Sequence, residues 1–515
     1  MPERPPHRAL FLITFCGFLL RLWVALHRPI DYDGYWHLFI ARQDSWAELA
    51  SEIPSIAHPP LFFILLRPLA LAWHSPLSYR TVSLLAGAGV IFLAGLLVWK
   101  AAATRTGALL TSAILALSWT SVEIATDVRS YALMVFWLLL ASYFWLRLID
   151  SNLTRDAAMF GVTASLAVLS HYAAPIYLIA LVAAFAITRH REFLTKSSLP
   201  KLALALAIPA IVSAAVYVVH ARAWASPLSH LPSHYFNPAS HESISGFLTR
   251  NTLFLARTFW PRWLRLPAMF VFVIAIVVLG FRALPRLARP WLLLPCFLFV
   301  GLALAGLAGK YPFGGAMRQQ YFLAVAFTIT TGAVIGIYLD RLPAYRTPLA
   351  LALLAIPAAT LAESITWDLH TPETPGVDQA RSFHENFPDA TAVYVDRHNL
   401  IPFFAQHHTW NWRFLKQTGS ARMYELQKGS RKLLLIRDSP WNPEPWDPST
   451  LSAASQAVYN GQSKVVLYVQ RQAPVPGIDA PQQLLDKMQN PAQAHGLRIT
   501  RIVSKDGVRL IELSR

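Results

Sequence analysis

Two carboxylates and a histidine follow the first apolar run of the chain, in a stretch whose residue types could carry out acid–base chemistry. Asp31, Asp33 and His37 lie between that run and His58. Charge at the edge of a membrane is costly to maintain and usually has a function. A carboxylate there can act as a general base toward a hydroxyl group, and Asp33 is our candidate; the alternative is a solvated surface charge. In an extended segment Asp31 points to the opposite side, which argues against an equal pair.

His58 opens a second stretch, in which two prolines precede a short apolar segment. Pro59 and Pro60 restrict the backbone, and proline is tolerated in the first turn of a helix. We therefore expect a helix over residues 61–74 that begins at these prolines. His58 could point into a cavity beside that helix or could cap the turn, and the sequence leaves both interpretations open.

Arginines at two further places could bind an anion, and Arg129 is the first. It lies between Asp127 and Tyr131, and its planar guanidinium group suits a phosphate. The competing interpretation is an ion pair of Asp127 with Arg129 or with another neighbour. Glu123, Asp127 and Tyr131 are spaced four apart, so they share one face if the segment is helical.

The second arginine, Arg318, lies in a later segment of the chain. Gly314 and Gly315 precede it and permit a close approach of the backbone, and Lys310 adds positive charge. The alternative is that both basic residues are anchors near a helix end, with their charged groups reaching the membrane surface.

The scaffold for these residues is predicted to be a set of membrane-spanning helices. Of the 515 residues, 55% are hydrophobic and 14% are charged, whereas a soluble domain has about 25% charged residues. Several apolar runs reach the roughly 20 residues that cross a bilayer. We predict a polytopic α-helical membrane protein with about eleven transmembrane helices and a C-terminal soluble α/β domain. The expected spans are residues 9–26, 78–99, 107–122, 130–148, 157–171, 173–188, 202–220, 267–281, 291–309, 321–339 and 348–366.

The distribution of basic residues predicts the orientation of these helices. The net charge is +17, and the basic residues concentrate between apolar runs, which favours membrane topology over nucleic-acid binding. Because Arg67 and Pro68 interrupt the short apolar segment after His58, we expect an interfacial helix there and not a span. The N-terminus is then cytoplasmic, as a retained signal anchor. Two arginines, Arg129 and Arg318, and the lysine before Arg318 are left in short outer loops, where a bound anion would explain them.

Composition divides the chain into two domains. Residues 1–367 are expected to form the transmembrane domain, with residues 27–77 as its first outer loop, and residues 368–515 an extracytoplasmic α/β domain. Alternating apolar residues predict strands in the second domain, and Lys505–Gly507 carries a hairpin signal. The predicted strands are residues 392–395, 432–436, 464–469, 498–503 and 508–513, and a helix is expected over residues 479–490.

The histidines of a later outer loop give no metal signal, and the two cysteines give no disulfide signal. An outer loop is expected over residues 221–266, and we interpret it as a loop that gates a cavity, because its histidines follow no ligand spacing. Cys16 and Cys296 lie inside apolar runs, so no disulfide is predicted. The histidines in and beside this loop are His220, His230, His234 and His241.

Together these motifs resemble the polytopic glycosyltransferases of the GT-C fold, in particular glycosyltransferase family 39, the bacterial relatives of protein O-mannosyltransferases and of the aminoarabinose transferase that modifies lipid A. Tyr32, Asp33 and Gly34 stand where that family has an Asp-Glu pair, with Gly34 in place of the second acid. His58–Phe63 is similar to its His-Pro-Pro-Leu-Tyr segment. The resemblance covers about residues 1–340 and continues in Thr126–Leu133, which looks like Glu-Ala-Arg-Pro-Tyr-Ala-Leu, in Ser170, His171 and Tyr172, which look like Thr-His-Tyr, and in residues 311–322, which resemble a late motif with an arginine.

The resemblance implies a fold and a function. The implied enzyme works at the outer face of a bacterial inner membrane, among membrane lipids and without nucleic acid. It transfers a sugar with inversion from an undecaprenyl- or other polyprenyl-phosphate donor to a glycan, lipid or protein acceptor. Asp33 would activate the acceptor, and Arg129, Arg318 and Lys310 would bind the donor phosphate. The supporting residues are expected to be Asp31, His37, His58, Asp127, Tyr131, His171 and Tyr172.

Two other classes of function are kept as alternatives. A lipid or polysaccharide transporter is expected to have internal repeats with discontinuous helices at matching places, and the sequence shows none. A non-enzymatic scaffold would use its outer domain to recruit envelope factors. The sequence has no nucleotide-binding or paired-cysteine zinc motif, so no cofactor is predicted with certainty. A divalent cation is left open, with Asp33, His37, His58, Glu123 and Asp127 as candidate ligands.

Overall fold

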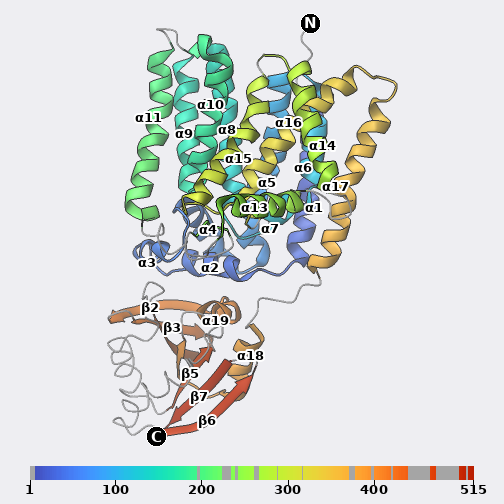
Figure 1. The fold of residues 1–515 in the computed structure, drawn as a ribbon. Helices are drawn as coiled ribbons and strands as arrows, with labels where there is room; N and C mark the ends of the chain where they lie inside the picture. Colours follow the sequence, from blue (N-terminus) through green and yellow to red (C-terminus); the bar gives the residue numbers. More distant parts are fainter. Residues whose placement is uncertain are drawn as a thin grey trace. The chain divides into compact units, whose positions relative to one another are not determined.

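A computed structural model describes the chain as two compact units (Figure 1). Met1–Arg28, Ala57–Leu65 and Arg80–Thr371 form the first unit, and Pro29–Ile56, Leu66–Tyr79 and Pro372–Arg515 form the second. Most of the first outer loop therefore belongs with the C-terminal residues. The structure describes residues 6–514 except 194–197, 223–233, 238–241, 260–265, 287, 316, 370–376, 396–398, 419–420, 439–463, 471–497 and 506–507.

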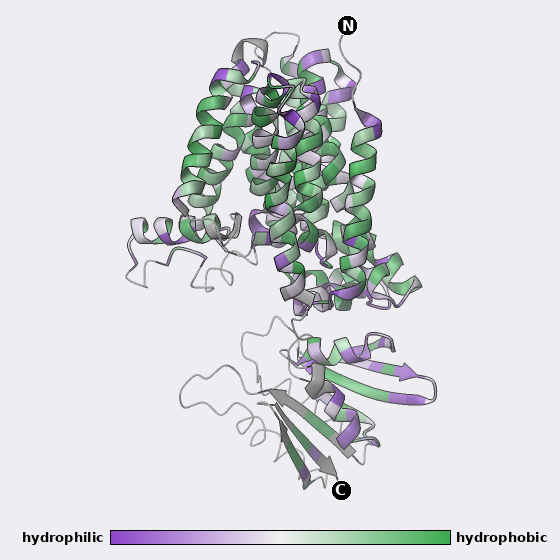
Figure 2. Ribbon diagram, turned by 90° about the vertical axis from the view of Figure 1, so that its right-hand side faces the viewer, coloured by the Kyte–Doolittle hydropathy of each residue, from purple (hydrophilic) through white to green (hydrophobic). Residues whose placement is uncertain are grey.

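The first unit is a bundle of apolar helices. Figure 2 shows hydrophobic residues along them, and side chains such as Phe11, Ile211 and Val271 are exposed on the outside of the bundle, as expected for contact with lipid. The described residues contain seven helices long and apolar enough to cross a membrane, or eight if the bent pair α6–α7 is one span. The chain is thus a multi-pass membrane protein. The helices of this unit are α1 (His7–His27), α6 (Arg105–Leu117), α7 (Trp119–Thr126), α8 (Tyr131–Ser151), α9 (Thr154–Ser170), α10 (Ala174–Phe193), α11 (Leu199–Val216), η2 (Tyr217–Ala221), α13 (Ile244–Phe259), α14 (Leu266–Ala283), α15 (Arg289–Leu307), η5 (Met317–Gln320), α16 (Tyr321–Asp340) and α17 (Arg346–Leu369).

Two more helices, α4 (Leu61–Ala72) and α5 (Pro76–Ala102), contribute residues to both units. A helix occupies each of the eleven predicted spans, with α6 and α7 sharing one of them, but among the described residues seven, or eight with this bent pair, are long and apolar enough to cross a membrane. The short segment that we expect at the membrane surface is α4, and its 12 residues, with Pro68 inside, are too few to cross a bilayer.

A buried arginine stabilises the break between α6 and α7, which bend by 60°. Arg21 of α1 is fully buried, and its guanidinium donates to the carbonyl oxygens of Leu115 (2.8 Å) and Ala116 (3.2 Å). It also donates to Ser121 Oγ of α7 at 2.8 Å. The last carbonyls of a helix have no partner within the helix, and a cation near them is favourable. Arg21 thus stabilises the bend that sets the direction of α7, whose C-cap is Asp127.

The second unit is built on a mixed sheet with the strand order β2-β3-β4-β1-β5-β7-β6. In its middle, β1 (Ala392–Val395) is parallel to β4 (Arg431–Asp438) and β5 (Lys464–Gln470), and the other pairs are antiparallel. The remaining elements are β2 (Asn411–Thr418), β3 (Ala421–Lys428), β6 (Arg498–Lys505), β7 (Val508–Ser514), α18 (Val377–Asn386) and α19 (Leu400–His407), with α2 (Tyr32–Ala41), α3 (Trp46–Glu52) and η1 (Ile53–Ser55) from the first outer loop.

The five predicted strands are confirmed as β1, β4, β5, β6 and β7, whereas β2 and β3 were not predicted. Neither missed strand alternates regularly. Arg422 lies on the buried face of β3 beside Tyr424, and the register of β2 shifts between Phe414 and Lys416. The pairing of β6 with β7 confirms the hairpin. Its turn at 506–507 and the helix expected over 479–490 lie outside the described residues.

The first outer loop is more helical than predicted. Asp31 itself is extended, but the extended segment expected to continue to Asp33 is wrong, because a helix begins at Tyr32. Asp31 is the N-cap of α2, and its side chain accepts a hydrogen bond from the Gly34 amide at 2.8 Å. Asp33 lies in the first turn of this helix. Aspartate at an N-cap satisfies amide groups that have no partner within the helix. This capping, and not an alternating pattern, decides the local structure.

Two neutral histidines pack together inside the second unit. His407 Nδ1–H donates to the Phe403 carbonyl at 2.7 Å, so its Nε2 accepts from His384 Nε2. His384 stacks on Trp410, with ring centroids 5.6 Å apart. Burial lowers the pKa of His384 to about 4 and that of His407 to about 3, and the nearby charge of Arg431 lowers both further. The folded unit therefore resists protonation of this pair.

This pair predicts acid sensitivity of the second unit. In the unfolded chain both imidazoles take up protons near their ordinary pKa of 6.5, but the folded unit does not, so stability falls as the pH drops from 6.5 towards about 4. His384→Gln, which can still donate to His407, should flatten this loss in thermal unfolding of the full-length protein in detergent. Much of the slope should remain, because burial still lowers the pKa of His407 to about 3 and also lowers the pKa of His408 and His74. An unchanged slope would contradict this account.

Candidate active site

Four segments that are distant in the sequence bring their aromatic and histidine side chains into one buried cluster of the first unit. The ring of His171 lies 4.6 Å from Tyr131, 5.1 Å from His58 and 6.0 Å from Tyr311 between centroids. His58 and Tyr131 are 5.8 Å apart. All four residues are at most 9% exposed. We refer to these four residues as the ring cluster; it unites the sequence motifs around His58, Tyr131 and His171 with the late segment of Tyr311.

Local structure fixes each ring of this cluster. His58 precedes the two prolines before α4, and Tyr131 begins α8. His171 is the C-cap of α9 in an extended conformation, and its Nδ1 accepts from the Ala173 amide at 3.1 Å, so the neutral ring carries its proton on Nε2. These helix ends place polar groups beside one another at the border of the apolar spans.

Arg318 is a neighbour of Tyr311, which is one of the four residues of the ring cluster. The Tyr311 hydroxyl donates to the Gln319 carbonyl at 2.9 Å. Burial raises the pKa of Tyr311 well above its ordinary value, the neighbouring Tyr131 and Tyr235 raise it further, and the charge of Arg318 opposes this. Tyr311 is therefore a neutral hydrogen-bonding group with a guanidinium in its neighbourhood.

The glycines before Arg318 permit the close approach that we predict from the sequence. Gly314 has a φ of +70°, and a Cβ atom there would lie 2.5 Å from the Asn251 carbonyl oxygen of α13. No larger residue fits without moving the backbone. Lys310, in contrast, is exposed just after α15.

Arg129 lies in a group of charges that the sequence reveals only in part. Its Nε is 4.0 Å from Asp127 Oδ2, whereas the closer partner of Asp127 is Arg28, whose Nη1 is 2.6 Å from Oδ1. Arg28 Nη2 also lies 3.5 Å from Glu123 Oε1. The Ser130 hydroxyl, next to Arg129, contacts His58 Nδ1 at 3.3 Å. The competing interpretation of Asp127 as an ion-pair partner is thus confirmed, with Arg28 as the main partner.

Glu123, Asp127 and Tyr131 do not share one helical face, because the segment that contains them is not a continuous helix. Helix α7 ends at Thr126, Asp127 has extended dihedral angles, and α8 begins only at Tyr131. The break turns Asp127 toward Arg28 and places Tyr131 in the ring cluster. Arg28 was not predicted as a site residue, because it falls within residues 27–77, the long first outer loop. It is a basic residue at the predicted outer end of the first span, which is the same signal that singled out Arg129.

Asp33 and His37 lie on α2 in the second unit, whereas the ring cluster belongs to the first. The Asp33 side chain is half-buried, and His37 Nδ1 donates to the Asp33 carbonyl oxygen at 2.6 Å. Tyr172 belongs to the first unit; its hydroxyl hydrogen-bonds to His220 Nδ1, and its ring centroid lies 6.4 Å from that of His171.

A metal site is not assembled in the part of the chain that the structure describes. There, no three or more histidine, cysteine, aspartate or glutamate residues come close enough to hold an ion. The candidate ligands at His58, Glu123 and Asp127 are engaged with Ser130, Arg28 and Tyr131 instead.

One protein-family model matches part of the chain. Residues 57–217 match a family model described as dolichyl-phosphate-mannose-protein mannosyltransferase. This range contains three of the four residues of the ring cluster, and Asp33 and Arg318 lie outside it. No curated protein matches this chain.

Solved structures show the fold of the whole chain. The crystal structure of ArnT from Cupriavidus metallidurans bound to undecaprenyl phosphate is similar to it, with a TM-score of 0.58 and 13% identity over 98% of this chain and 97% of that chain. ArnT in the apo state gives a TM-score of 0.58 and 12% identity over the same shares. The chain therefore has the predicted GT-C fold, and the family match together with this fold supports a membrane glycosyltransferase.

The ion pair between Arg28 and Asp127 is expected to be strongly coupled, because both side chains are about nine-tenths buried. We expect a double-mutant cycle with Arg28→Met and Asp127→Asn to give a coupling energy of about 2 kcal/mol in unfolding experiments in detergent. The exposed pair Arg250–Glu242 serves as the reference and should couple by about 0.5 kcal/mol. Equal coupling of the two pairs would contradict the assignment.

Proposed function

We propose that this chain is a glycosyltransferase that moves a sugar from a polyprenyl-phosphate donor to a hydroxyl group of an envelope acceptor, with inversion at the sugar carbon. The proposed place of reaction is the outer face of a bacterial inner membrane. The donor class is suggested by the likeness to an ArnT structure that contains undecaprenyl phosphate and by the match to a family named for a lipid-phosphate mannose donor. The acceptor is a glycan, a lipid or a protein.

The observation that carries this proposal is the ring cluster. His58, Tyr131, His171 and Tyr311 come from four separate segments, and all of them are buried in or beside the connections between helices. A bundle that needed only stability would place apolar side chains there, because buried polar groups require partners. The cluster offers buried polar groups to a lipid-linked phosphate, and charge interactions are stronger at a buried position than in bulk water.

Arg129 and Arg318 are the proposed ligands of the phosphate. Negative charge develops on the leaving polyprenyl phosphate, and fixed guanidinium groups stabilise it by about 3 kcal/mol for each donor, by analogy with oxyanion sites. Arg129 is 3% exposed and lies 4.0 Å from Asp127, whose closer partner is Arg28 at 2.6 Å. Lys310, which is exposed, is proposed to add long-range attraction.

Asp33 is the proposed general base. Its carboxylate accepts the proton of the acceptor hydroxyl while the oxygen attacks the anomeric carbon and the bond from that carbon to the phosphate oxygen breaks. The products are the glycosylated acceptor, the protonated carboxyl group and polyprenyl phosphate. Asp31 caps α2, and His37 bonds to the backbone of Asp33, so both contacts support the turn that carries the carboxylate.

Replacement of the proposed base tests the mechanism. We expect Asp33→Asn to lower sugar transfer by about a hundred- to ten-thousandfold, because the amide cannot accept the proton. The measurement is mass spectrometry of envelope glycans and lipids from cells that carry the variant as their only copy. Asp150→Asn, which removes a partly exposed carboxylate paired with Lys100, is the matched control and should keep normal transfer. Near-normal product with Asp33→Asn would remove this residue from the mechanism.

Replacement of the arginines tests the donor site. We expect Arg129→Ala and Arg318→Ala each to weaken binding of undecaprenyl phosphate by about ten- to a hundredfold, since each removes a charge-assisted hydrogen bond. Binding is measured on the purified full-length protein in detergent. Arg282→Ala, at an exposed position of α14, controls for loss of net charge. Unchanged affinity in both arginine variants would reject the phosphate assignment.

A further inference from the structure

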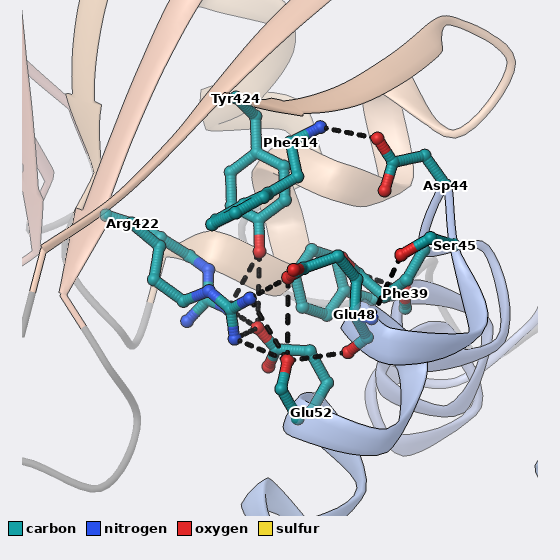
Figure 3. Close-up of polar contacts among 11 residues, drawn as sticks. Phe39, Asp44, Ser45, Glu48, Glu52, Phe414, Arg422 and Tyr424 are labelled. Atoms are coloured by element: carbon teal, nitrogen blue, oxygen red, sulfur yellow. Dashed lines mark hydrogen bonds and ion pairs between the residues drawn. The ribbon is translucent and has the colours of Figure 1, made fainter. Parts of the chain in front are cut away.

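A buried carboxylate of the first outer loop is bound by two arginines of the C-terminal sheet (Figure 3). Glu52, at the end of α3, is 1% exposed. Its Oε1 lies 2.6 Å from Arg422 Nη1 of β3 and also contacts Arg437 Nη2 of β4. The hydroxyl of Tyr424, on β3, donates to the same oxygen at 3.2 Å. All of these residues belong to the second unit.

The charges of this group balance only when the loop and the sheet are together. Arg422 also contacts Glu48, so two carboxylates face two guanidinium groups. Both arginines are at most 7% exposed. Desolvation of an arginine is costly unless it is paired, and removal of one partner leaves an uncompensated buried charge. Without the loop helix α3, the sheet would retain two buried cations.

The same interface holds α2, the helix that carries Asp33. Phe39 of α2 packs against Phe404, Trp412 and Tyr424, with ring centroids 5.4, 5.9 and 6.2 Å away. The Arg437 guanidinium lies 5.1 Å from the centroid of Phe39, at the distance of a cation–π contact. Arg437 therefore touches both the carboxylate of α3 and an aromatic ring of α2.

The turn between α2 and α3 is bound to the sheet by its polar groups. Arg42 Nη2 donates to the Trp410 carbonyl at 3.3 Å, and Asp44 Oδ2 accepts from the Phe414 amide of β2 at 3.0 Å. Both helices and the turn between them are thus held by the C-terminal residues. A domain that only recognised an acceptor would not need buried charges directed at the first loop.

We propose that the C-terminal domain is the support of α2, and that Glu52 is a positioning residue which holds this helix, and with it Asp33, through Arg437 and Arg422. The proposal rests on the proposed role of Asp33 as general base. Glu52 does not touch substrate; it acts by limiting the movement of α2. Small displacements of a catalytic group by a distant change can lower the rate by about a hundredfold.

The test is Glu52→Gln in the full-length protein, with three readouts. Hydrogen exchange of the α2 amides should become faster, sugar transfer should fall by about a hundredfold, and the affinity for undecaprenyl phosphate should stay within about twofold, because Arg129 and Arg318 belong to the other unit. Glu425→Gln on β3, which breaks an exposed pair with Lys432, is the matched control and should change none of these.

The combination of readouts separates positioning from general damage. If Glu52→Gln loses undecaprenyl phosphate binding in parallel with sugar transfer, the role of Glu52 is structural only and the proposal is overturned. Hydrogen exchange of α2 as slow as in the unchanged protein, together with normal sugar transfer, would also overturn it. If Glu52→Gln does not fold, Tyr424→Phe removes one hydrogen bond to the same carboxylate and should give the same pattern at smaller size. Full transfer by Asp33→Asn would instead refute the proposed function, and faster α2 exchange in Glu52→Gln would still be observed.

Discussion

The burial of guanidinium groups is the constraint on which this structure depends. A buried arginine cannot lose its charge and must find acceptors inside the protein. Arg21 finds them in the last carbonyls of α6, Arg28 in Asp127, and Arg437 in Glu52. In each case the acceptor belongs to another element, so the need for a partner fixes the position of that element. Arg129 is buried as well and lies 4.0 Å from the same Asp127.

The ring cluster adds a second property to this arrangement. His58, Tyr131, His171 and Tyr311 are buried groups whose imidazoles and hydroxyls can donate or accept hydrogen bonds. Their positions at helix ends bring them to the border of the apolar spans, where a lipid-linked phosphate would enter sideways from the membrane. Charge from the arginines and adaptable hydrogen bonding from the rings together suit a charged headgroup on an apolar chain.

Much of the fold could be predicted from the sequence, because membrane spans are set by the length and apolarity of single segments. Each predicted span contains a helix, and the interruption by Arg67 and Pro68 correctly indicated a short helix. The GT-C resemblance also agrees with the observed fold. The missed elements depend on distant partners: β3 carries Arg422 on its buried face, which is compatible with a strand only because Glu52 lies opposite.

The motifs that contribute to the site could be predicted from the sequence, but the contacts between their side chains could not. His58, Tyr131 and His171 stood out by type and position, and they do meet. Arg28 did not stand out, because its importance comes from Asp127 across a break between helices. The helical start at Tyr32 depends on the capping of Asp31, a local effect that competes with any extended reading of the same residues.

The most direct test of the central claim is an experimental structure of the full-length protein with undecaprenyl phosphate. The account predicts that the phosphate lies within hydrogen-bonding distance of the guanidinium groups of both Arg129 and Arg318, beside the ring cluster. A phosphate bound elsewhere, with these two arginines directed away from it, would contradict the account.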